Sequence, residues 1–389
     1  MNDDRRTTGR GVSRRRLLQA GGVVTAGSLA GCGGLLGTGT DGESDGDGSG
    51  DQPPWYGSGP GAFEERGTPG GTSMDEMPDL SGTINVYSGR GEGLVGDLVS
   101  YLENRYPDLT VNPTYDSATN LARRIQTEGE NTPADVFYSV NAGALGFVDE
   151  EGYTETLTDD TTSLVAEQFR ANDGGWTGTS GRARTVPYNT DTLSASDVPD
   201  SIMSFPDLSQ YSGQIGWAPT YSSFQAFVTA MRILEGEDAT RQWLSGMQDL
   251  NVQEYNDEFA VAQAVADGEL AMGFTNHYYI QRVLAGQPNA SVATAFTSGD
   301  AGSIFNVAGA ARINASGQSE MADLFVRHLL SSEAQEYFAI RTFEYPLVEG
   351  VDPVGSLPSI GELDVPNISL SQLSDLESTV TLLRDEGIL

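Results

Sequence analysis

The chain contains no lysine, one cysteine (Cys32) and two histidines (His277 and His328) among its 389 residues. A single cysteine excludes an internal disulfide and any metal site built from several thiolates. Two histidines cannot supply the sets of imidazoles found in the common zinc and copper sites. A metal ion bound by this chain therefore has to be held largely by oxygen atoms.

Positive charge is also scarce. The 21 basic residues are all arginine and stand against 55 acidic residues, which gives a net charge of -34. This balance makes nucleic acid and anionic membrane surfaces poor partners. We interpret the charge as the solvated surface of a halophilic protein, because concentrated salt screens self-repulsion over a few ångströms. We take no binding site from it.

The N-terminal region lacks an apolar run of membrane-spanning length, because residues 17–31 are rich in Gly, Ala, Ser and Thr and a span needs about 20 apolar residues. Ser13-Arg14-Arg15-Arg16-Leu17-Leu18 opens this run and Leu29-Ala30-Gly31-Cys32 ends it. The pattern is typical of a twin-arginine export signal with a lipoprotein cleavage site. We expect residues 1–31 to be removed, and a lipid on Cys32 to anchor the protein at the extracellular face of the cytoplasmic membrane.

Two regions follow Cys32. Residues 32–81 are rich in Gly, Ser and Asp and poor in aliphatic side chains, which predicts a disordered acidic linker. The body, residues 82–389, is longer than one hydrophobic core usually serves, so we expect two lobes. Strands are predicted at 83–88, 109–115, 135–138, 214–218 and 270–275, and helices at 94–102, 120–128, 223–234, 259–267, 320–330 and 333–338. This alternation indicates an α/β fold with mainly parallel sheets flanked by helices.

Three turns at strand ends are candidate ligand sites, because open α/β sheets bind ligands there. The first is Ser88-Gly89-Arg90-Gly91-Glu92, which offers a guanidinium and a carboxylate. The second is Pro219-Thr220-Tyr221-Ser222-Ser223-Phe224, with hydroxyl groups before a helix whose free N–H groups favour an anion. The third is Thr275-Asn276-His277-Tyr278-Tyr279. Taken singly, each is equally an ordinary turn, helix cap or packing motif.

The adjacent phenols of Tyr278 and Tyr279 are the most informative pair. On a regular strand they would point to opposite faces, so they can meet one ligand only if the chain turns there. A phenolate is a hard oxygen donor suited to Fe(III), and a trivalent ion can deprotonate a group whose ordinary pKa is about 10. Tyrosine pairs also pack in cores, so the residues alone leave both interpretations open.

The order of several segments carries a family resemblance: TINVYSGRGE, TPADVFYSVNAGAL, SGRARTVPYNTDTL, GQIGWAPTYSSFQAFVTAM, NHYYIQ, GSIFNVAGAARI and FEYPLV. Over the whole body the chain resembles the periplasmic ferric-ion-binding proteins of ABC importers. The resemblance implies a two-lobed type II periplasmic-binding-protein fold, hinged by two crossing strands, with a cleft that closes on its ligand. It implies lobe 1 at 82–185 plus 306–355 and lobe 2 at 186–305 plus 356–389.

Matched position by position, the resemblance also implies a site. Tyr278 and Tyr279 match the paired Fe(III) ligands, and Tyr221 is a third candidate phenolate. The residues implied for an anion such as phosphate or carbonate are Thr220, Ser222, Ser223 and Arg182. The first lobe departs from the family, with Gly91 in place of a histidine and Val140 in place of a glutamate. Arg90, Glu92 and Asn141 lie beside those positions as possible substitutes.

The implied function is that of an extracellular solute-binding protein, not an enzyme, which delivers Fe(III), bare or chelated, to an ABC permease and its ATPase, with no catalytic cofactor and as a monomer. Thiamine, a polyamine or another organic solute stacked on the tyrosines stays open as cargo. A hydrolase using carboxylate pairs is a further alternative, although the chain has no Gly-x-Ser-x-Gly or His-Glu-x-x-His motif. We expect His277 and His328 to be non-ligands, with His328 exposed on a helix.

Overall fold

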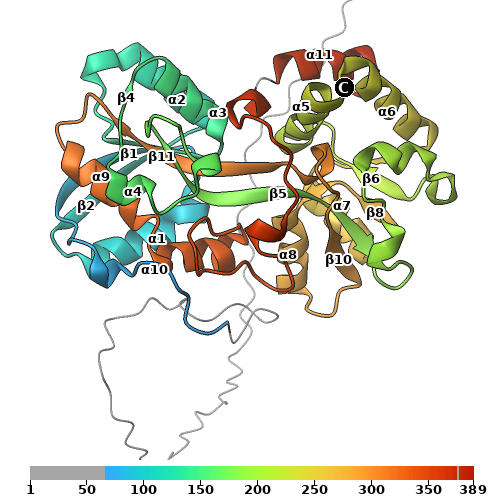
Figure 1. The fold of residues 1–389 in the computed structure, drawn as a ribbon, viewed down its shortest axis with the longest axis horizontal. Helices are drawn as coiled ribbons and strands as arrows, with labels where there is room; N and C mark the ends of the chain where they lie inside the picture. Colours follow the sequence, from blue (N-terminus) through green and yellow to red (C-terminus); the bar gives the residue numbers. More distant parts are fainter. Residues whose placement is uncertain (1–65, 375) are drawn as a thin grey trace, which may run out of the picture. The chain divides into compact units, whose positions relative to one another are not determined.

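The computed structural model describes residues 66–374 and 376–389 (Figure 1). Cys32 and the export signal lie outside the described residues. The strands of this part of the chain are β1 (Gly82–Ser88), β2 (Leu109–Tyr115), β3 (Val136–Ser139), β4 (Thr154–Glu155), β5 (Thr177–Asn189), β6 (Ile215–Trp217), β7 (Gln253–Glu254), β8 (Met272–Gly273), β9 (Thr275–Asn276), β10 (Val292–Ala295) and β11 (Phe305–Ile313).

The helices complete the α/β pattern. They are α1 (Glu92–Arg105), α2 (Ala118–Glu128), α3 (Ala142–Glu150), α4 (Asp159–Thr162), α5 (Ser222–Glu235), α6 (Glu237–Asp249), α7 (Glu258–Ala266), α8 (His277–Gly286), α9 (Ser319–His328), α10 (Ser332–Tyr337) and α11 (Glu377–Asp385). Among the described residues, no helix has the length and apolar character needed to cross a bilayer.

The strands pair in the order β2-β1-β3-β11-β5-β8-β6-β7. At one end β1 runs parallel to β2 and β3, and at the other β6 runs parallel to β7 and β8. Between these groups β5 and β11 form a long antiparallel pair, which runs from one lobe into the other in Figure 1. The expected two-lobed α/β fold with crossing strands is therefore confirmed. The lobe boundaries at residues 185, 305 and 355 stay a prediction.

Lobe 1 is built on two apolar clusters. Because successive side chains of a strand point to opposite faces, Ile84 and Val86 of β1 join the cluster that contains Leu98 of α1, whereas Tyr87 joins the cluster around Phe137. The alternation read in the sequence of β1 thus determines which helices cover each face.

Lobe 2 has an aromatic core around the start of α5. The ring centroids of Trp217 and Phe224 lie 5.4 Å apart, and those of Phe227 and Trp243 lie 5.6 Å apart. Each such ring buries roughly 150–250 Å². This packing fixes the first turn of α5, which follows directly on Tyr221.

The ordered body begins before residue 82, so the linker prediction is wrong for its last part. Arg66 donates from Nε and Nη2 to the two carboxylate oxygens of Glu336, at 2.8 Å and 2.9 Å. Ser73 donates a hydrogen bond of 2.6 Å to Glu333, and Met74 is buried in the lobe 1 core. An ion pair, a hydrogen bond and buried apolar side chains, including Leu80 as well as Met74, hold a segment whose composition alone indicates disorder.

The expectation that His328 is exposed is also wrong. Its side chain is buried at the end of α9, where Nδ1 lies 2.8 Å from the carbonyl oxygen of Leu324 and Nε2 lies 3.0 Å from the hydroxyl of Tyr106. These two contacts fit a neutral imidazole that donates from Nδ1 and accepts at Nε2. Both ring nitrogens are satisfied inside the core, so burial is tolerated.

Candidate functional site

A cavity of about 740 Å³ lies where the two lobes face each other across β5 and β11. This is the size of an ordinary small-molecule site, roughly 300–1,000 Å³. The starts of α2 and α3 border it from lobe 1, and the starts of α5 and α8 border it from lobe 2. The described polar residues that line it are Ser117, Thr119, Arg123, Asn141, Arg182, Tyr221, Ser222, Ser223, Asn276, Tyr278, Tyr279 and Asn306.

Three phenols meet on the lobe 2 side of this cavity. Tyr221 is the residue before α5, and Tyr278 and Tyr279 are in the first turn of α8, which begins at His277. The hydroxyl oxygens of Tyr221 and Tyr279 are 2.7 Å apart, and the rings of Tyr278 and Tyr279 have centroids 4.3 Å apart. The chain does turn at Asn276, as expected, because a short strand there passes into a helix.

Burial governs the ionisation of these phenols. It raises the pKa of Tyr278, against the opposing charge of Arg182, and it raises the pKa of Tyr279 far above its ordinary value of 10, together with the adjacent Tyr278 phenol and the hydrogen bond to Tyr221. Both phenols are therefore protonated in the free protein at neutral pH. A cation that binds through their oxygen atoms has to displace those protons.

The described cavity lining is basic, although the chain is acidic. Arg123 and Arg182 line it, and none of the described lining residues is Asp or Glu. The Nε atom of Arg182 is buried and has no hydrogen-bond partner among the described residues, while its Nη2 donates to the carbonyl oxygen of Val140. The local field therefore favours negatively charged groups in the cavity.

The hydroxyl side chains at 220–223, before and at the start of α5, differ in whether they line the cavity. Ser222 and Ser223 line the cavity, whereas the exposed Thr220 is outside the lining. The hydroxyl of Ser223 donates a hydrogen bond of 2.6 Å to Glu258. Of the residues implied for an anion in this loop, Ser222 is thus the one that both lines the cavity and keeps its hydroxyl free of other described groups.

A buried ion pair supports the phenols from behind. The carboxylate of Glu258, at the start of α7, accepts hydrogen bonds from Ser223 and, at 2.9 Å, from the backbone N–H of Asn276. Arg184 of β5 donates to the same carboxylate, and its guanidinium lies over the ring of Phe227 at 5.0 Å. Both charged side chains are fully buried. Glu258 thereby ties the start of α5, with Tyr221, to the start of α8, with Tyr278 and Tyr279.

His277 faces away from the cavity, as expected for a non-ligand. Its Nδ1 accepts a hydrogen bond of 3.1 Å from the N–H of Ala183, and its Nε2 lies 2.8 Å from the carbonyl oxygen of Phe343. Burial lowers the pKa of His277 to about 4. The neutral ring therefore joins the first residue of α8 to the crossing strand β5.

In the first lobe, Arg90 and Glu92 are not among the cavity-lining residues. Arg90 is fully buried and binds Glu344 at 2.6 Å and Ser180 at 2.9 Å. Burial would raise the pKa of Glu344, but the charge of Arg90 holds it below its usual range. Glu92 is exposed at the start of α1. Asn141 does line the cavity, and its side chain caps α3 by accepting from the N–H of Ala144 at 2.9 Å.

Sequence reasoning missed Arg123, Ser117, Thr119 and Asn306 as lining residues. The first three lie in and just before α2, which follows β2 directly. Because β2 is parallel to β1, its carboxyl end points to the same edge of the sheet as the Arg90 turn. The rule that ligands bind at this edge, applied to each predicted strand, would have found these three.

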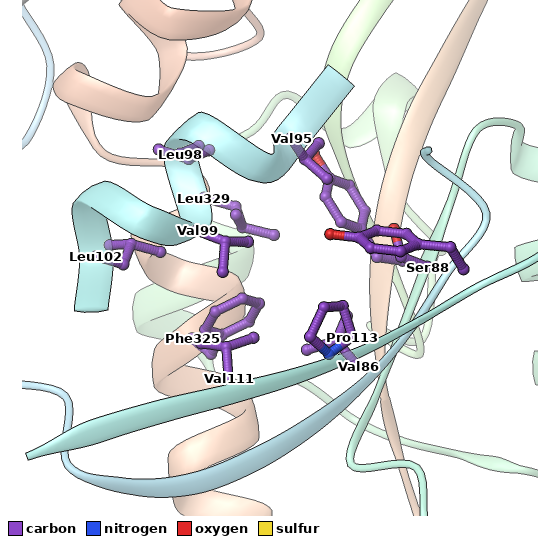
Figure 2. A pocket seen from close by; sticks show the side chains of 12 residues that line it. Val86, Ser88, Val95, Leu98, Val99, Leu102, Val111, Pro113, Phe325 and Leu329 are labelled. Atoms are coloured by element: carbon purple, nitrogen blue, oxygen red, sulfur yellow. The ribbon is translucent and has the colours of Figure 1, made fainter. Parts of the chain in front are cut away.

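Two further features of the described residues bear on where a ligand binds. Among the described residues, no group of three His, Cys, Asp or Glu side chains is suited to a metal ion. A second cavity, inside lobe 1, measures only about 10 Å³ (Figure 2). Aliphatic side chains such as Val86, Val95 and Val111 point toward it, and it is a packing void rather than a binding site.

Comparison with known proteins agrees with this architecture. The chain is 30% identical over 320 residues to iron uptake protein A2 of Synechocystis. The aligned residues cover 79% of this chain and 90% of that protein. It is 29% identical over 310 residues to the major ferric iron-binding protein of Neisseria meningitidis, covering 78% of this chain and 93% of that one.

Solved structures of similar proteins share this two-lobed fold. Iron-bound HitA from Pseudomonas aeruginosa superposes with a TM-score of 0.69 at 27% identity, covering 78% of this chain and 99% of HitA. The Trichodesmium protein IdiA (FutA), in complex with iron and citrate, gives a TM-score of 0.68 at 25% identity over 79% of this chain and all of that one. The family model of the bacterial extracellular solute-binding proteins matches residues 131–359. The chain therefore belongs to the bacterial extracellular solute-binding protein family, with periplasmic ferric-ion-binding proteins among its relatives.

Proposed function

We propose that this protein captures Fe(III) between its two lobes and delivers it to the permease of an ABC importer. The observation that carries the proposal is the meeting of three phenols, Tyr221, Tyr278 and Tyr279, at one wall of the interlobe cavity. Phenolate oxygen is a hard donor that matches a small trivalent ion. In a chain with one cysteine and two buried histidines, these phenols are the best available ligand set.

The relatives support the same cargo. Two of them are named for ferric iron or iron uptake, and two of the similar solved structures hold iron. Iron binding can be carried over to this chain for a physical reason: Tyr278 and Tyr279 at the start of α8 lie next to Tyr221, which precedes α5.

The mechanism follows from the hinge. Lobe 2 carries the phenols on the rigid starts of α5 and α8, so it makes the first contact with iron. Rotation about β5 and β11 then brings the starts of α2 and α3 over the bound ion and excludes water. Exclusion of water strengthens the phenolate-to-metal attraction, because the local dielectric falls. The permease and its ATPase would accept the closed form. In this scheme the protein binds and releases its cargo and performs no chemical step.

The basic lining argues against an organic cation as cargo. Thiamine and polyamines carry positive charge, and Arg123 and Arg182 face the space they would occupy. The same arginines, with Ser222 and Asn276, suit an anion that binds together with Fe(III), for which phosphate and carbonate are candidates. We assign Arg90 and Ser223 to holding the lobes and helices in place, and Thr220 and Glu92 to the surface.

The N-terminal residues complete the proposal. The Arg14-Arg15 signal would export the protein, and a lipid on Cys32 would keep the monomer at the extracellular face of the membrane, close to its permease. The acidic surface would keep it soluble in concentrated salt.

The test is to titrate the metal-free protein with Fe(III) in the presence of bicarbonate while recording the visible spectrum. We expect one equivalent of iron to produce a phenolate-to-Fe(III) charge-transfer band. Native mass spectrometry of protein purified from its own host should show the same single iron. A protein that gains neither the band nor the mass of one iron ion would rule out Fe(III) as cargo.

A further inference from the structure

One buried side chain at the start of α8 forms a bridge between two other parts of the molecule. His277 is fully buried, directly precedes Tyr278 and Tyr279, and is not among the described residues that line the cavity. Its Nδ1 accepts a hydrogen bond of 3.1 Å from the N–H of Ala183 in β5. The ring proton is therefore on Nε2, which donates it to the carbonyl oxygen of Phe343, 2.8 Å away. The imidazole thus ties the helix start to β5 and to the segment around Phe343.

The two ends of the bond between His277 and Phe343 belong to different lobes. Phe343 is part of the lobe 1 apolar cluster that contains side chains of β1, whereas Tyr279 of α8 belongs to a lobe 2 cluster with Val261 of α7. Tyr278, between them, packs against both clusters. The segment that follows α10 and the start of α8 therefore meet where the two lobes adjoin (Figure 1). A change in the angle between the lobes acts directly on this helix start.

The lobe 1 end of this bond has an unusual backbone. After α10 the chain forms a π-helix, Phe338–Thr342, and the next residue, Phe343, is in the left-handed region with a φ of 59°. That region is unfavourable for a bulky side chain, and such residues and π-helical turns gather at sites that change conformation. Tyr345, two residues on, exchanges two backbone hydrogen bonds of 2.8 Å with Gly181 of β5. His277 thus binds a part of lobe 1 whose conformation is held by its contacts rather than by its own preference.

We propose that His277 is a positioning residue that couples the lobe hinge to the phenols. Its hydrogen bond to Phe343 sets the direction of the first turn of α8, and so where the oxygens of Tyr278 and Tyr279 lie relative to Tyr221. Opening the lobes has to break this bond or turn the helix start with it. Either change loosens the hold of the phenols on iron. The inference rests on the proposed function and makes it more specific, because it names the contact through which the hinge regulates iron release.

The experiment uses two amide side chains that each replace one half of the imidazole, in the full-length protein. The amide of His277→Asn reaches only as far as Nδ1, so it keeps the bond to Ala183 and loses the bond to Phe343. The amide of His277→Gln reaches as far as Nε2 and keeps the bond to Phe343. His328→Asn is the control, because it removes the contact of the other buried histidine with Tyr106 inside lobe 1. Each protein is loaded with Fe(III) and bicarbonate, and iron release to excess EDTA is followed through the phenolate band.

We expect His277→Asn to release iron about tenfold faster than the unmodified protein, within the range usual for coupling between two sites, and to shift the phenolate band. His277→Gln should keep the release rate and the band close to those of the unmodified protein. His328→Asn should unfold at a lower temperature but release iron at the unmodified rate. In the metal-free protein, amide hydrogen exchange at the start of α8 and around Phe343 should rise together in His277→Asn and in neither place in His277→Gln.

The outcomes separate the inference from the proposed function. If His277→Asn and His277→Gln release iron at the same rate with the same band, the coupling is overturned and Fe(III) capture stands. The coupling is also overturned if His328→Asn speeds release as much as His277→Asn does, because lost stability then explains the effect. Equal hydrogen exchange in the two His277 variants would show that the bond to Phe343 does not hold the helix start. If the unmodified protein gives no phenolate band with Fe(III), the proposed function falls and the inference falls with it.

Discussion

The phenol oxygens of Tyr221 and Tyr279 lie 2.7 Å apart and share a hydrogen bond between the starts of α5 and α8. At this distance one proton has to lie between the two oxygens. If both phenols lost their protons, two negative charges would repel each other in a buried place. A multivalent cation between them removes that repulsion, so the pair is stable either protonated or bound to metal.

Replacing Tyr221 with Phe should weaken iron binding without abolishing it. Tyr278 and Tyr279 remain as ligands, so a charge-transfer band should persist at lower intensity and at a shifted wavelength. We expect affinity to fall roughly tenfold or more, because one charged oxygen ligand is lost. Iron titration of the variant measures both effects. A spectrum and affinity equal to those of the unmodified protein would remove Tyr221 from the ligand set.

Iron binding should release protons. Because burial raises the pKa of Tyr278 and Tyr279, both are protonated before iron arrives and deprotonated after it binds. Each released proton makes affinity rise about tenfold per pH unit, so affinity should increase steeply from acid to neutral pH. Titration in weakly buffered solution, with the released acid measured, gives the proton count. Fewer than two protons per iron would contradict a paired-phenolate site.

Glu258 should act as a positioning residue for the phenols. Glu258→Gln keeps the shape of the side chain but leaves the buried guanidinium of Arg184 without a counter-charge. Breaking a buried pair in this way costs about 3–5 kcal/mol of unfolding free energy, which urea unfolding measures. The charge-transfer band of the iron complex should also shift, since the starts of α5 and α8 lose a shared anchor.

The double variant Arg184→Met with Glu258→Gln is the control for that effect. It removes both charges, so it should recover part of the stability lost in Glu258→Gln. If the single and double variants unfold alike, the ion pair has no net role in holding the two helix starts together.

The two histidines should make the fold sensitive to acid. Burial lowers the pKa of His277 and of His328 to about 4, while an unfolded histidine titrates near 6.5. Unfolding therefore takes up protons below about pH 6.5, and stability, which is complete above that value, falls as pH drops toward 4. The expected loss is about 3 kcal/mol for each histidine.

His328→Gln tests this assignment away from the phenols. The variant should be less stable than the unmodified protein at neutral pH, because its contacts with Tyr106 and Leu324 change. Its stability should nevertheless depend less on pH between about 6.5 and 4. An equally steep loss of stability in both proteins would place the acid sensitivity in other groups.

Local patterns predicted most of the elements. The alternation in residues 83–88 became β1, and the helical spacing at 120–128 and 223–234 became α2 and α5, with ends that differ by one or two residues. These segments bury one face each, so their periodicity follows directly from their packing. The order of strands, with β5 and β11 joining the lobes, came from the family resemblance and not from any local pattern.

The supporting residues could not be predicted in the same way. Glu258 is one of 55 acidic residues, and nothing near it in the sequence indicates that it meets Arg184, which is 74 positions earlier. Arg90 seemed a ligand candidate because it follows a strand, but its partner Glu344 lies 254 positions away. Long-range ion pairs decide which of several similar side chains face the cavity, and a single sequence does not record them.

The most direct test of the account is the visible spectrum of the iron-loaded double variant Tyr278→Phe/Tyr279→Phe beside that of Tyr255→Phe. Tyr255 packs against the same lobe 2 cluster as Tyr279 and is not among the cavity-lining residues. We predict that the double variant loses the phenolate-to-Fe(III) band and binds iron far more weakly, while Tyr255→Phe keeps both. A double variant that retains the band and the affinity of the unmodified protein would contradict the account.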